Sequence, residues 1–229
     1  MCGRYQLDVP FNRLVELYGP FEKEMSGMYT THLNIAPTQS VPVVLPGARL
    51  SVMRWGFPAT WLTREGQNPW SGRPLFNARS ESARTKMTWK QSLLERRCLL
   101  PCTGFYEWIR QQGKRLPIWF RPARTDVLSM AGIWREFDKD GERISCVSIL
   151  TIEANSRVAP IHDRMPVFIP VHARDAWLDH RFIPDFPSYF RSAPDGILDV
   201  HPVSTRLGQT RATDSGVLIA DWALDPGFE

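Results

Sequence analysis

The sequence lacks any long hydrophobic run and any common phosphate-binding signature. No stretch approaches the roughly 18 consecutive apolar residues that a membrane helix needs, and residues 1–19 are polar and interrupted by Pro10, unlike a secretory leader. The patterns Gly-x-x-x-x-Gly-Lys-Ser/Thr, Gly-x-Gly-x-x-Gly and Gly-x-Ser-x-Gly do not occur. Their absence argues against P-loop NTPases, dinucleotide-binding enzymes and α/β-hydrolases. We therefore expect no membrane partner.

Cysteine is scarce and is not arranged as a metal site or a disulfide framework. The four cysteines, at positions 2, 98, 102 and 146, form no Cys-x-x-Cys pair, and no His-Glu-x-x-His is present. These absences argue against structural zinc and against a zinc protease. The segment Asp138-Lys139-Asp140-Gly141 matches a calcium loop only in part, and a hairpin turn suits it better. We expect free thiols in a reducing, cytoplasmic compartment, with no metal and no cofactor.

The composition is that of an ordinary globular protein, with 43% hydrophobic and 23% charged residues among 229. We expect a single domain over residues 1–229 that acts as a monomer. The formal net charge of +4 is by itself weak support for a polyanionic partner. Nine tryptophans are many for this length, and those outside the core offer flat surfaces on which bases stack.

Alternating apolar segments separated by turn residues predict an α+β fold. Helices are expected from an N-cap at Asp8 to near Gly19, over Trp89–Arg96 and Ala173–Asp179, and near Tyr189. Strands are expected at Val41–Leu45, Leu50–Trp55, Cys98–Pro101, Gly104–Arg110, Leu116–Arg121, Leu128–Phe137, Arg143–Ile152, Pro166–Ile169 and Ile197–Val203. Turn residues at 111–114 and 138–141 join neighbouring strands. The expected core is one mostly antiparallel sheet, curled or barrel-like, flanked by a few short helices.

The opening Met1-Cys2-Gly3 predicts an N-terminal cysteine, because methionine is removed when the next residue is small. The product carries an amine and a thiol on adjacent carbons. Their reference pKa values of about 8 and about 8.5 predict useful fractions of both nucleophiles near neutral pH. Such a 1,2-aminothiol condenses with an aldehyde to an imine and then closes a thiazolidine, and Gly3 allows close approach of a substrate. Alternatively, Cys2 is an arbitrary second residue.

Two further residues have the chemistry of proton transfer. Glu107 shares a strand face with Phe105 and opposes Tyr106 and Trp108, so we expect partial desolvation to raise its pKa. The alternative is a strand carboxylate that reaches solvent or pairs with an arginine. His162 stands in a loop before a proline, where a lone histidine is more often a surface residue. General acid/base work suits the Glu107 carboxyl.

Taken together, seven ordered blocks resemble the SRAP (SOS response-associated peptidase) family. The blocks are Met1-Cys2-Gly3-Arg4, Asn34-Ile35-Ala36-Pro37, Arg54-Trp55-Gly56, Asn77-Ala78-Arg79-Ser80-Glu81, Gly104-Phe105-Tyr106-Glu107-Trp108, His162-Asp163-Arg164-Met165-Pro166 and His201-Pro202-Val203-Ser204. The resemblance implies covalent capture of abasic sites in single-stranded DNA through the N-terminal cysteine, a lyase-like chemistry that shields the lesion. It also implies self-processing that removes Met1, and action at the nucleoid.

The resemblance also implies roles for individual residues. Cys2 would be the nucleophile, Asn77 would position the opened sugar or the cysteine, and Glu107 would move protons. His162 would assist opening of the sugar ring and release of the crosslink. The residues implied to bind DNA are Gly3, Arg4, Asn34, Trp61, Arg79, Lys86, Trp108, Thr151 and Arg164.

The chain departs from the family pattern at three places. Trp61-Leu62 stands where two adjacent aromatics are usual, so Trp61 either stacks on bases or packs within its loop. Lys86 stands where an arginine is expected, which keeps the charge but loses bidentate phosphate geometry. The sequence ends at Glu229 without the long tail of eukaryotic members, as expected for a compact bacterial form.

Three other functions remain open from the sequence. The same Cys2, Glu107 and His162 would serve a thiol peptidase. Met-Cys-Gly also begins glutamine amidotransferases with an N-terminal nucleophile, although 229 residues leave no room for a synthase domain. A non-covalent reader of modified bases would need the pocket but not Cys2, so substitution of Cys2 separates a reader from a crosslinking enzyme.

Overall fold

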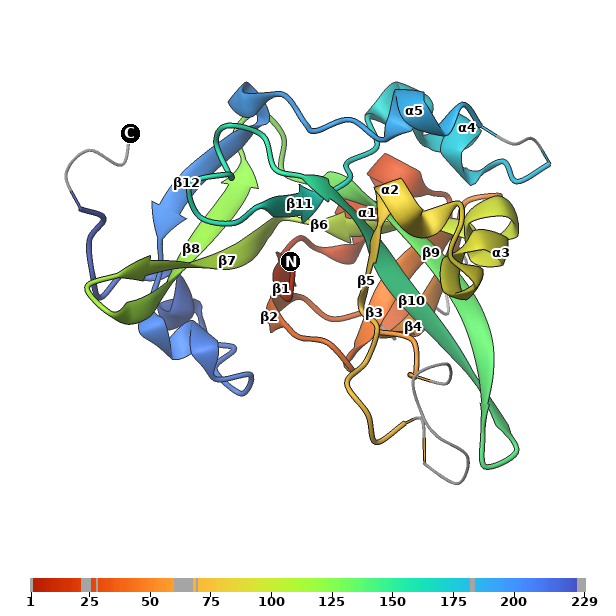
Figure 1. The fold of residues 1–229 in the computed structure, drawn as a ribbon, viewed down its shortest axis with the longest axis horizontal. Helices are drawn as coiled ribbons and strands as arrows, with labels where there is room; N and C mark the ends of the chain where they lie inside the picture. The colour runs from red at the N-terminus through yellow and green to blue at the C-terminus, as the bar shows by residue number, and fades with distance from the viewer. Residues whose placement is uncertain are drawn as a thin grey trace.

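The computed structural model describes residues 2–21, 26–27, 29–59, 68, 70–181 and 184–225. Its core is built from two sheets that meet near the amino terminus (Figure 1). Sheet A has the order β12-β8-β7-β1-β2, and all its pairings are antiparallel. Its strands are β1 (Arg4–Leu7), β2 (His32–Ile35), β7 (Gly104–Gln111), β8 (Lys114–Pro122) and β12 (Leu198–Pro202).

Sheet B closes into a five-stranded barrel because β10 pairs with both β4 and β9. Around the barrel the order is β10-β4-β3-β6-β9, and two short strands, β5 and β11, extend the pairing of β10. Most pairings are antiparallel, and β10 runs parallel to β4 and β5. The strands are β3 (Ser40–Leu45), β4 (Arg49–Trp55), β5 (Asn77–Arg79), β6 (Arg97–Cys102), β9 (Leu128–Lys139), β10 (Glu142–Glu153) and β11 (Arg164–Pro166).

Short helices flank the barrel, as Figure 1 shows. They are α1 (Phe11–Tyr18), α2 (Ser80–Ala83), α3 (Met87–Glu95), α4 (Arg174–Leu178) and α5 (Phe186–Tyr189). The buried Arg97 ties two of them to the barrel, because its guanidinium donates to carbonyl oxygens of α3 and to those of Trp177 and Asp179. The predicted α+β fold with a barrel-like, mostly antiparallel core is confirmed.

Each face of sheet A packs against a different core. Phe105 and Phe120 stack with ring centroids 4.8 Å apart and join the main core with the barrel. The opposite face, with Tyr106, packs under the chain after β12 in a second cluster that includes Leu207 and Val217. Because successive strand residues point to opposite faces, Glu107 of β7 points toward the barrel. Trp108 points toward the chain after β12, which we call the C-terminal segment.

The two predicted turns are confirmed as tight hairpins. Gln112 and Gly113 join β7 to β8, and Asp140 and Gly141 join β9 to β10, all with positive φ. Two adjacent residues with positive φ match the right-handed twist of the strands that they connect. The segment at 138–141 is therefore a hairpin turn and not a calcium loop.

Several predicted boundaries were wrong. Helix α1 begins at Phe11 with Pro10 as its N-cap, and the backbone N–H of Asp8 donates to Thr103 instead of Asp8 capping the helix. The strand expected at Pro166–Ile169 is β11, Arg164–Pro166, followed by a single bridge at Phe168. The prediction missed four short elements, β1, β2, β5 and α2, since three or four residues carry too little periodicity to predict a strand or a helix.

Replacing Gly104 by alanine should lower the free energy of unfolding by roughly 3 kcal/mol. Gly104 has a φ of 154°, and a methyl group there would meet the indole of Trp119 and would lie 2.8 Å from the carbonyl oxygen of Phe120. Urea unfolding measures the loss. Gly113→Ala is the control, because Gly113 has a φ of 76° but open space around it, and it should cost only about 1 kcal/mol. Equal losses would contradict the steric account.

Candidate active site

The amino-terminal cysteine lies buried where the two sheets meet. Cys2 precedes β1, is fully buried, and its thiol lies 3.8 Å from the carbonyl oxygen of Arg4. The side-chain amide of Asn77 donates to the Cys2 carbonyl oxygen at 2.8 Å. Asn77 begins β5, and its pairing with Ile149 of β10 holds it beside Cys2. Oδ1 of Asn77 is buried and accepts no hydrogen bond from the described residues.

Burial changes the chemistry of the Cys2 thiol. It raises the thiol pKa well above its usual range, and the negative charge of Glu107 raises it further. The expected useful fraction of thiolate at neutral pH was therefore wrong, because the reference value applies to a solvated thiol. In this site burial favours the protonated thiol, so a nucleophilic role for the sulfur would require a base.

Glu107 has the properties of such a base. Its carboxyl is 4% exposed, and burial raises its pKa from the ordinary value of 4.5 to about 7. The positive charge of Arg115 lowers the pKa in part. The predicted desolvation is confirmed, and so is the predicted face, since Glu107 points toward the barrel with Phe105. A carboxyl with a pKa near 7 both donates and accepts protons at neutral pH.

His162 is half-buried, with a side chain 26% exposed, and not a fully exposed surface residue. Its Nδ1 accepts the backbone N–H of Arg164 at 2.9 Å and also lies 2.9 Å from a carboxylate oxygen of Asp163. These contacts require opposite protonation states. Burial lowers the pKa of His162, so we assign a neutral ring with its hydrogen on Nε2.

The expected DNA-contacting arginines are in very different environments. Arg4 donates to Asn34 Oδ1 at 2.6 Å and to the carbonyl oxygens of Leu207 and Gly208 at 2.8 and 3.2 Å. Arg164, with a side chain 11% exposed, forms a bidentate pair with Glu81 at 2.7 and 2.8 Å. Arg79, by contrast, is exposed at the start of α2.

The other residues implied to bind DNA also differ widely in their exposure to solvent. Asn34 is fully buried and Thr151 is fully buried, with its carbonyl oxygen accepting from Arg164 at 2.6 Å. Lys86 is exposed at the N-cap of α3. Gly3 and Trp108 are half-buried. Trp61 lies outside the described residues.

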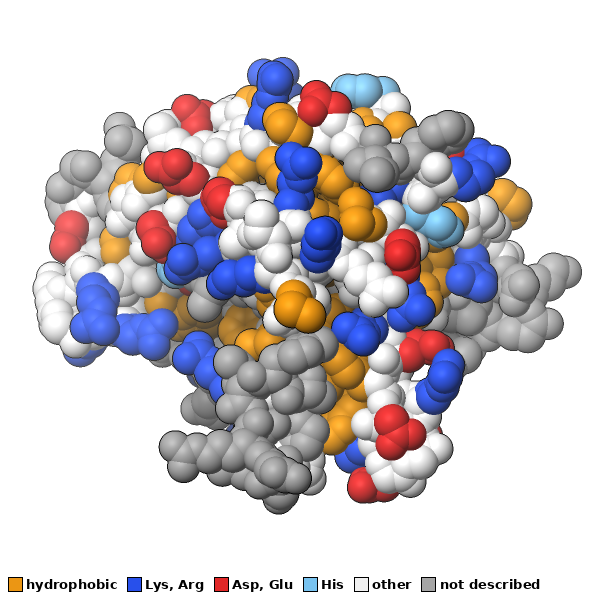
Figure 2. Space-filling model, turned by 45° about the vertical axis from the view of Figure 1, so that its right-hand side comes forward, with side chains coloured by type: hydrophobic (Ala, Val, Ile, Leu, Met, Phe, Trp, Pro, Cys, Tyr) orange, Lys and Arg blue, Asp and Glu red, His pale blue; other side chains and the backbone are white. Residues whose placement is uncertain are grey.

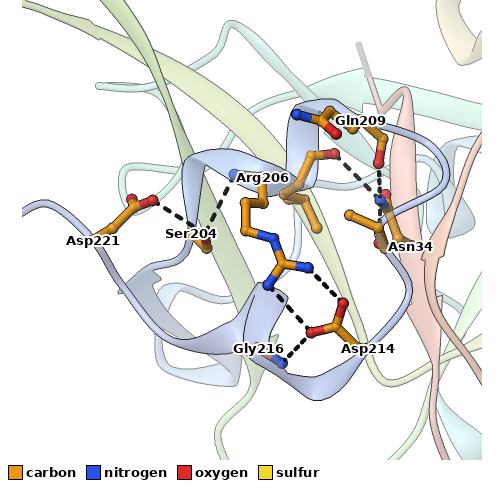
Figure 3. A network of polar contacts seen from close by, with 9 residues as sticks. Asn34, Ser204, Arg206, Gln209, Asp214, Gly216 and Asp221 are labelled. Atoms are coloured by element: carbon orange, nitrogen blue, oxygen red, sulfur yellow. Dashed lines mark hydrogen bonds and ion pairs between the residues drawn. The ribbon is translucent and has the colours of Figure 1, made fainter.

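Asn34 fastens the C-terminal segment. Its amide donates to the carbonyl oxygens of Leu207, Gln209 and Ala212 at 2.9 to 3.3 Å, as Figure 3 shows for Gln209. The segment is closed further by the ion pair between Arg206 and Asp214 at 2.6 Å. In this structure Asn34 therefore contributes to the site by holding Arg4 and the segment beside it, and its contact with DNA stays a prediction.

A cavity of about 410 Å³ opens beside this arrangement. Its lining residues are Gly3, Arg4, Glu107, Trp108, Arg115, Thr205 and Gly208. A larger cavity, of about 690 Å³, lies between α1, the β3–β4 turn and α4 and shares none of these residues. We assign the smaller one to the site, because it alone of the two contains the carboxyl with the raised pKa and reaches the amino terminus.

Three lining residues were missed by sequence reasoning: Arg115, Thr205 and Gly208. A signal existed for Arg115. The hairpin turn at Gln112 and Gly113 sets the register in which Trp108 pairs with Pro117 and Arg110 with Arg115, so Arg115 is diagonal to Trp108 on one face. Thr205 and Gly208 come from a segment of no regular pattern.

Neither a metal-binding cluster nor a membrane-spanning helix occurs among the described residues. No group of three or more His, Cys, Asp or Glu side chains there is placed to hold a metal ion. All four cysteines are buried free thiols. None of the helices in the described part of the chain is long and apolar enough to cross a membrane.

Glu107→Gln should change how stability depends on pH. Since the folded state raises the pKa of Glu107 from 4.5 to about 7, it holds a proton that the unfolded chain releases, and wild-type stability falls between these pH values. The glutamine variant should lack this fall and gain on the order of 3 kcal/mol relative to wild type from pH 4.5 to pH 8. Urea unfolding across this range measures it. Parallel stability curves would show that burial does not perturb Glu107.

Comparisons with known proteins agree on one family. The family model described as SOS response associated peptidase (SRAP) matches residues 1–210. The abasic site processing protein YoqW of Bacillus subtilis is 28% identical over 184 residues, covering 78% of this chain and 80% of its own length. YedK of Escherichia coli, with the same description, is 25% identical over 226 residues, covering 92% and 96%. HMCES of Gallus gallus, also so described, is 29% identical and is matched over 65% of its length, against 81% of this chain.

Solved structures share the fold. A protein from Bacteroides thetaiotaomicron superposes with a TM-score of 0.84 at 19% identity, over 97% of this chain and all of that one. A protein from Bordetella bronchiseptica gives a TM-score of 0.74 at 22% identity, over 89% of this chain and all of the other. The match of the family model over nearly the whole sequence, on the same residues that build the buried amino-terminal site, makes this chain a member of the SOS response associated peptidase (SRAP) family.

Proposed function

We propose that this protein captures abasic sites in single-stranded DNA covalently, through Cys2 after removal of Met1. The observation that carries the proposal is the burial of Cys2 beside Glu107, a carboxyl whose pKa of about 7 suits proton transfer at neutral pH. The description of its relatives as abasic site processing proteins supports the same substrate.

The raised thiol pKa favours an order in which the amine reacts first. The free amine of Cys2 adds to the aldehyde carbon of the opened sugar, and water leaves to give an imine. The thiol sulfur then adds to the imine carbon while Glu107 accepts the thiol proton and the imine nitrogen takes one up. The product is a five-membered thiazolidine, and no oxidant or reductant is consumed.

Asn77 and His162 have geometry that suits supporting roles. The Asn77 amide holds the Cys2 carbonyl, and its buried Oδ1 has the capacity to accept a hydrogen bond from the new amine or from a sugar hydroxyl. An abasic sugar is mostly a closed hemiacetal. The Nε2–H of neutral His162 would protonate the ring oxygen and so assist opening.

We propose that single-stranded DNA lies on the surface around the site. Figure 2 shows Lys and Arg side chains spread across one face with hydrophobic side chains between them. Phosphates need cations and bases need flat apolar surfaces. We propose exposed Arg79 and half-buried Trp108 as contacts of this kind, and Arg164 as a cation that a phosphate would have to share with Glu81. A monomeric state and a cytoplasmic location at the nucleoid stay predictions.

The family's description also names a peptidase. Removal of Met1 is required for the proposed amine and is the peptidase step that we include. Cleavage of other peptides is a weaker candidate, because a buried thiol with a raised pKa supplies little thiolate for attack.

Covalent capture predicts a complex that survives denaturation. Wild-type protein, with loss of Met1 confirmed by mass, should give a shifted band on a denaturing gel with a single-stranded oligonucleotide carrying one abasic site. The intact oligonucleotide should give none, and Cys2→Ala and Cys2→Ser should lose the band. Both covalent capture and a non-covalent reader allow the Cys2→Ser variant to keep native binding, so that result does not separate them. Absence of the band with wild-type protein would exclude capture and favour a non-covalent reader.

The role of Glu107 predicts a pH-dependent defect in the Glu107→Gln variant. Its crosslinking rate should fall by about 100-fold near pH 8, since proton transfer by a positioned group contributes at least that much. The defect should shrink as pH falls below 7, because wild-type Glu107 is then protonated and no longer a base. Single-turnover rates from pH 5.5 to 8.5 measure the ratio of variant to wild type. A ratio constant with pH would assign Glu107 a purely structural role.

A further inference from the structure

The two arginines of the 410 Å³ cavity differ in what they bind. The guanidinium of Arg4 donates its hydrogen bonds to the protein itself, at Asn34, Leu207 and Gly208. Burial also lowers its pKa. An anion entering the cavity would have to compete with these acceptors, so Arg4 is better suited to hold the C-terminal segment than to bind a ligand.

Arg115 is the other cation of the cavity. It lies on β8, its side chain is exposed, and among the described residues it makes no hydrogen bond or ion pair. Its guanidinium lies 6.0 Å from the centre of the Trp108 ring. Its charge also reaches Glu107, whose pKa it lowers. Arg115 is therefore an available guanidinium beside the proposed catalytic carboxyl.

The surroundings of Arg115 favour an anionic ligand with more than one oxygen. A guanidinium presents a planar fork of N–H donors that matches phosphate in two parallel hydrogen bonds. The guanidinium groups of Arg4 and Arg115 each lie 6.0 Å from the centre of the Trp108 ring, and such a contact limits the orientations of an otherwise flexible side chain. Glu107 is the one acidic residue among the described residues of the cavity lining, and it faces the barrel with Phe105.

We propose that Arg115 binds a backbone phosphate adjacent to the abasic nucleotide, in the cavity that it shares with Glu107 and Gly3. This inference rests on the proposed function and adds a substrate-binding residue to it. Binding there would place the nucleotide's sugar next to the amino terminus. It would leave Arg4 as a positioning residue that joins β1 to the C-terminal segment.

Arg115→Ala tests the proposal, with Arg110→Ala as a matched control. Arg110 is the direct cross-strand partner of Arg115 and is exposed, and it does not line the cavity, so both variants remove one surface charge from the same hairpin. The probe is a fluorescent single-stranded oligonucleotide with one tetrahydrofuran abasic analogue, which has no aldehyde and binds without crosslinking. Anisotropy titrations at several salt concentrations give the affinity and its salt dependence.

Arg115→Ala should bind about fivefold more weakly than wild type near 0.1 M salt, and its log–log salt slope should be about 0.7 smaller, as expected for one lost phosphate contact on a single strand. Arg110→Ala should keep most of the wild-type slope. With a true abasic oligonucleotide at pH 8.5, where Glu107 is ionised in the wild type and a modest rise of its pKa leaves it so, the crosslinking rate of Arg115→Ala should fall at low DNA concentration and recover at saturation.

The alternative outcomes separate this inference from the proposed function. If wild type crosslinks but Arg115→Ala and Arg110→Ala show equal slopes and affinities, Arg115 acts only through its general charge and the inference is wrong. If wild type forms no crosslink yet Arg115→Ala still loses the salt-dependent contact, the phosphate subsite stands and covalent capture fails.

Discussion

The antiparallel pairing of β1 with β7 is the interaction on which the site depends. In this register Arg4 pairs with Tyr106 and Tyr5 with Phe105, so the residues just before β1 lie alongside Glu107. Asn77 completes the arrangement from the barrel side by holding the Cys2 carbonyl at 2.8 Å. One strand of sheet A and one of sheet B thus converge on the end of the chain, which explains why Cys2 is fully buried despite being the second residue.

Desolvation then sets the chemistry of both groups. A buried site disfavours charge, so the pKa values of the Cys2 thiol and of Glu107 both rise, and the negative charge of Glu107 raises the pKa of the thiol further. A solvated aminothiol would offer an amine and some thiolate together. In the mechanism that we propose for this site, the amine is the first nucleophile, and the sulfur follows when Glu107 takes its proton.

The arginines of the site divide into structural and available cations. Arg4 and Arg164 are held by protein acceptors, through Leu207, Gly208 and Asn34 in one case and Glu81 in the other. Arg115 lines the same cavity as Arg4 without such partners among the described residues. Net charge alone does not separate these classes, because a guanidinium that satisfies buried carbonyl oxygens stabilises the fold instead of attracting DNA.

The longer strands and hairpins were predictable because their signals are local. The alternation of apolar and polar residues and the turn residues between them predict β7 to β10 and their tight turns from neighbouring residues alone. The site residues Cys2, Asn77, Glu107 and His162 were also named from the sequence, by chemistry and by family resemblance, and their catalytic roles stay predictions. The short strands β1 and β5 were not predictable, since each exists only through pairing with a strand far along the chain.

The sequence by itself determined which functional groups the protein has: a cysteine at position 2, a carboxyl at Glu107 within an aromatic strand, and an excess of positive charge. The tertiary structure alone decided their state. It buried the thiol and the carboxyl, and it placed Arg4 and Asn34 where their hydrogen bonds hold the C-terminal segment. It also left Arg115 in the cavity lining, available to bind an anion. The physical reason is that pKa and hydrogen-bond satisfaction depend on solvent exclusion and on neighbours from distant strands, which no local pattern encodes.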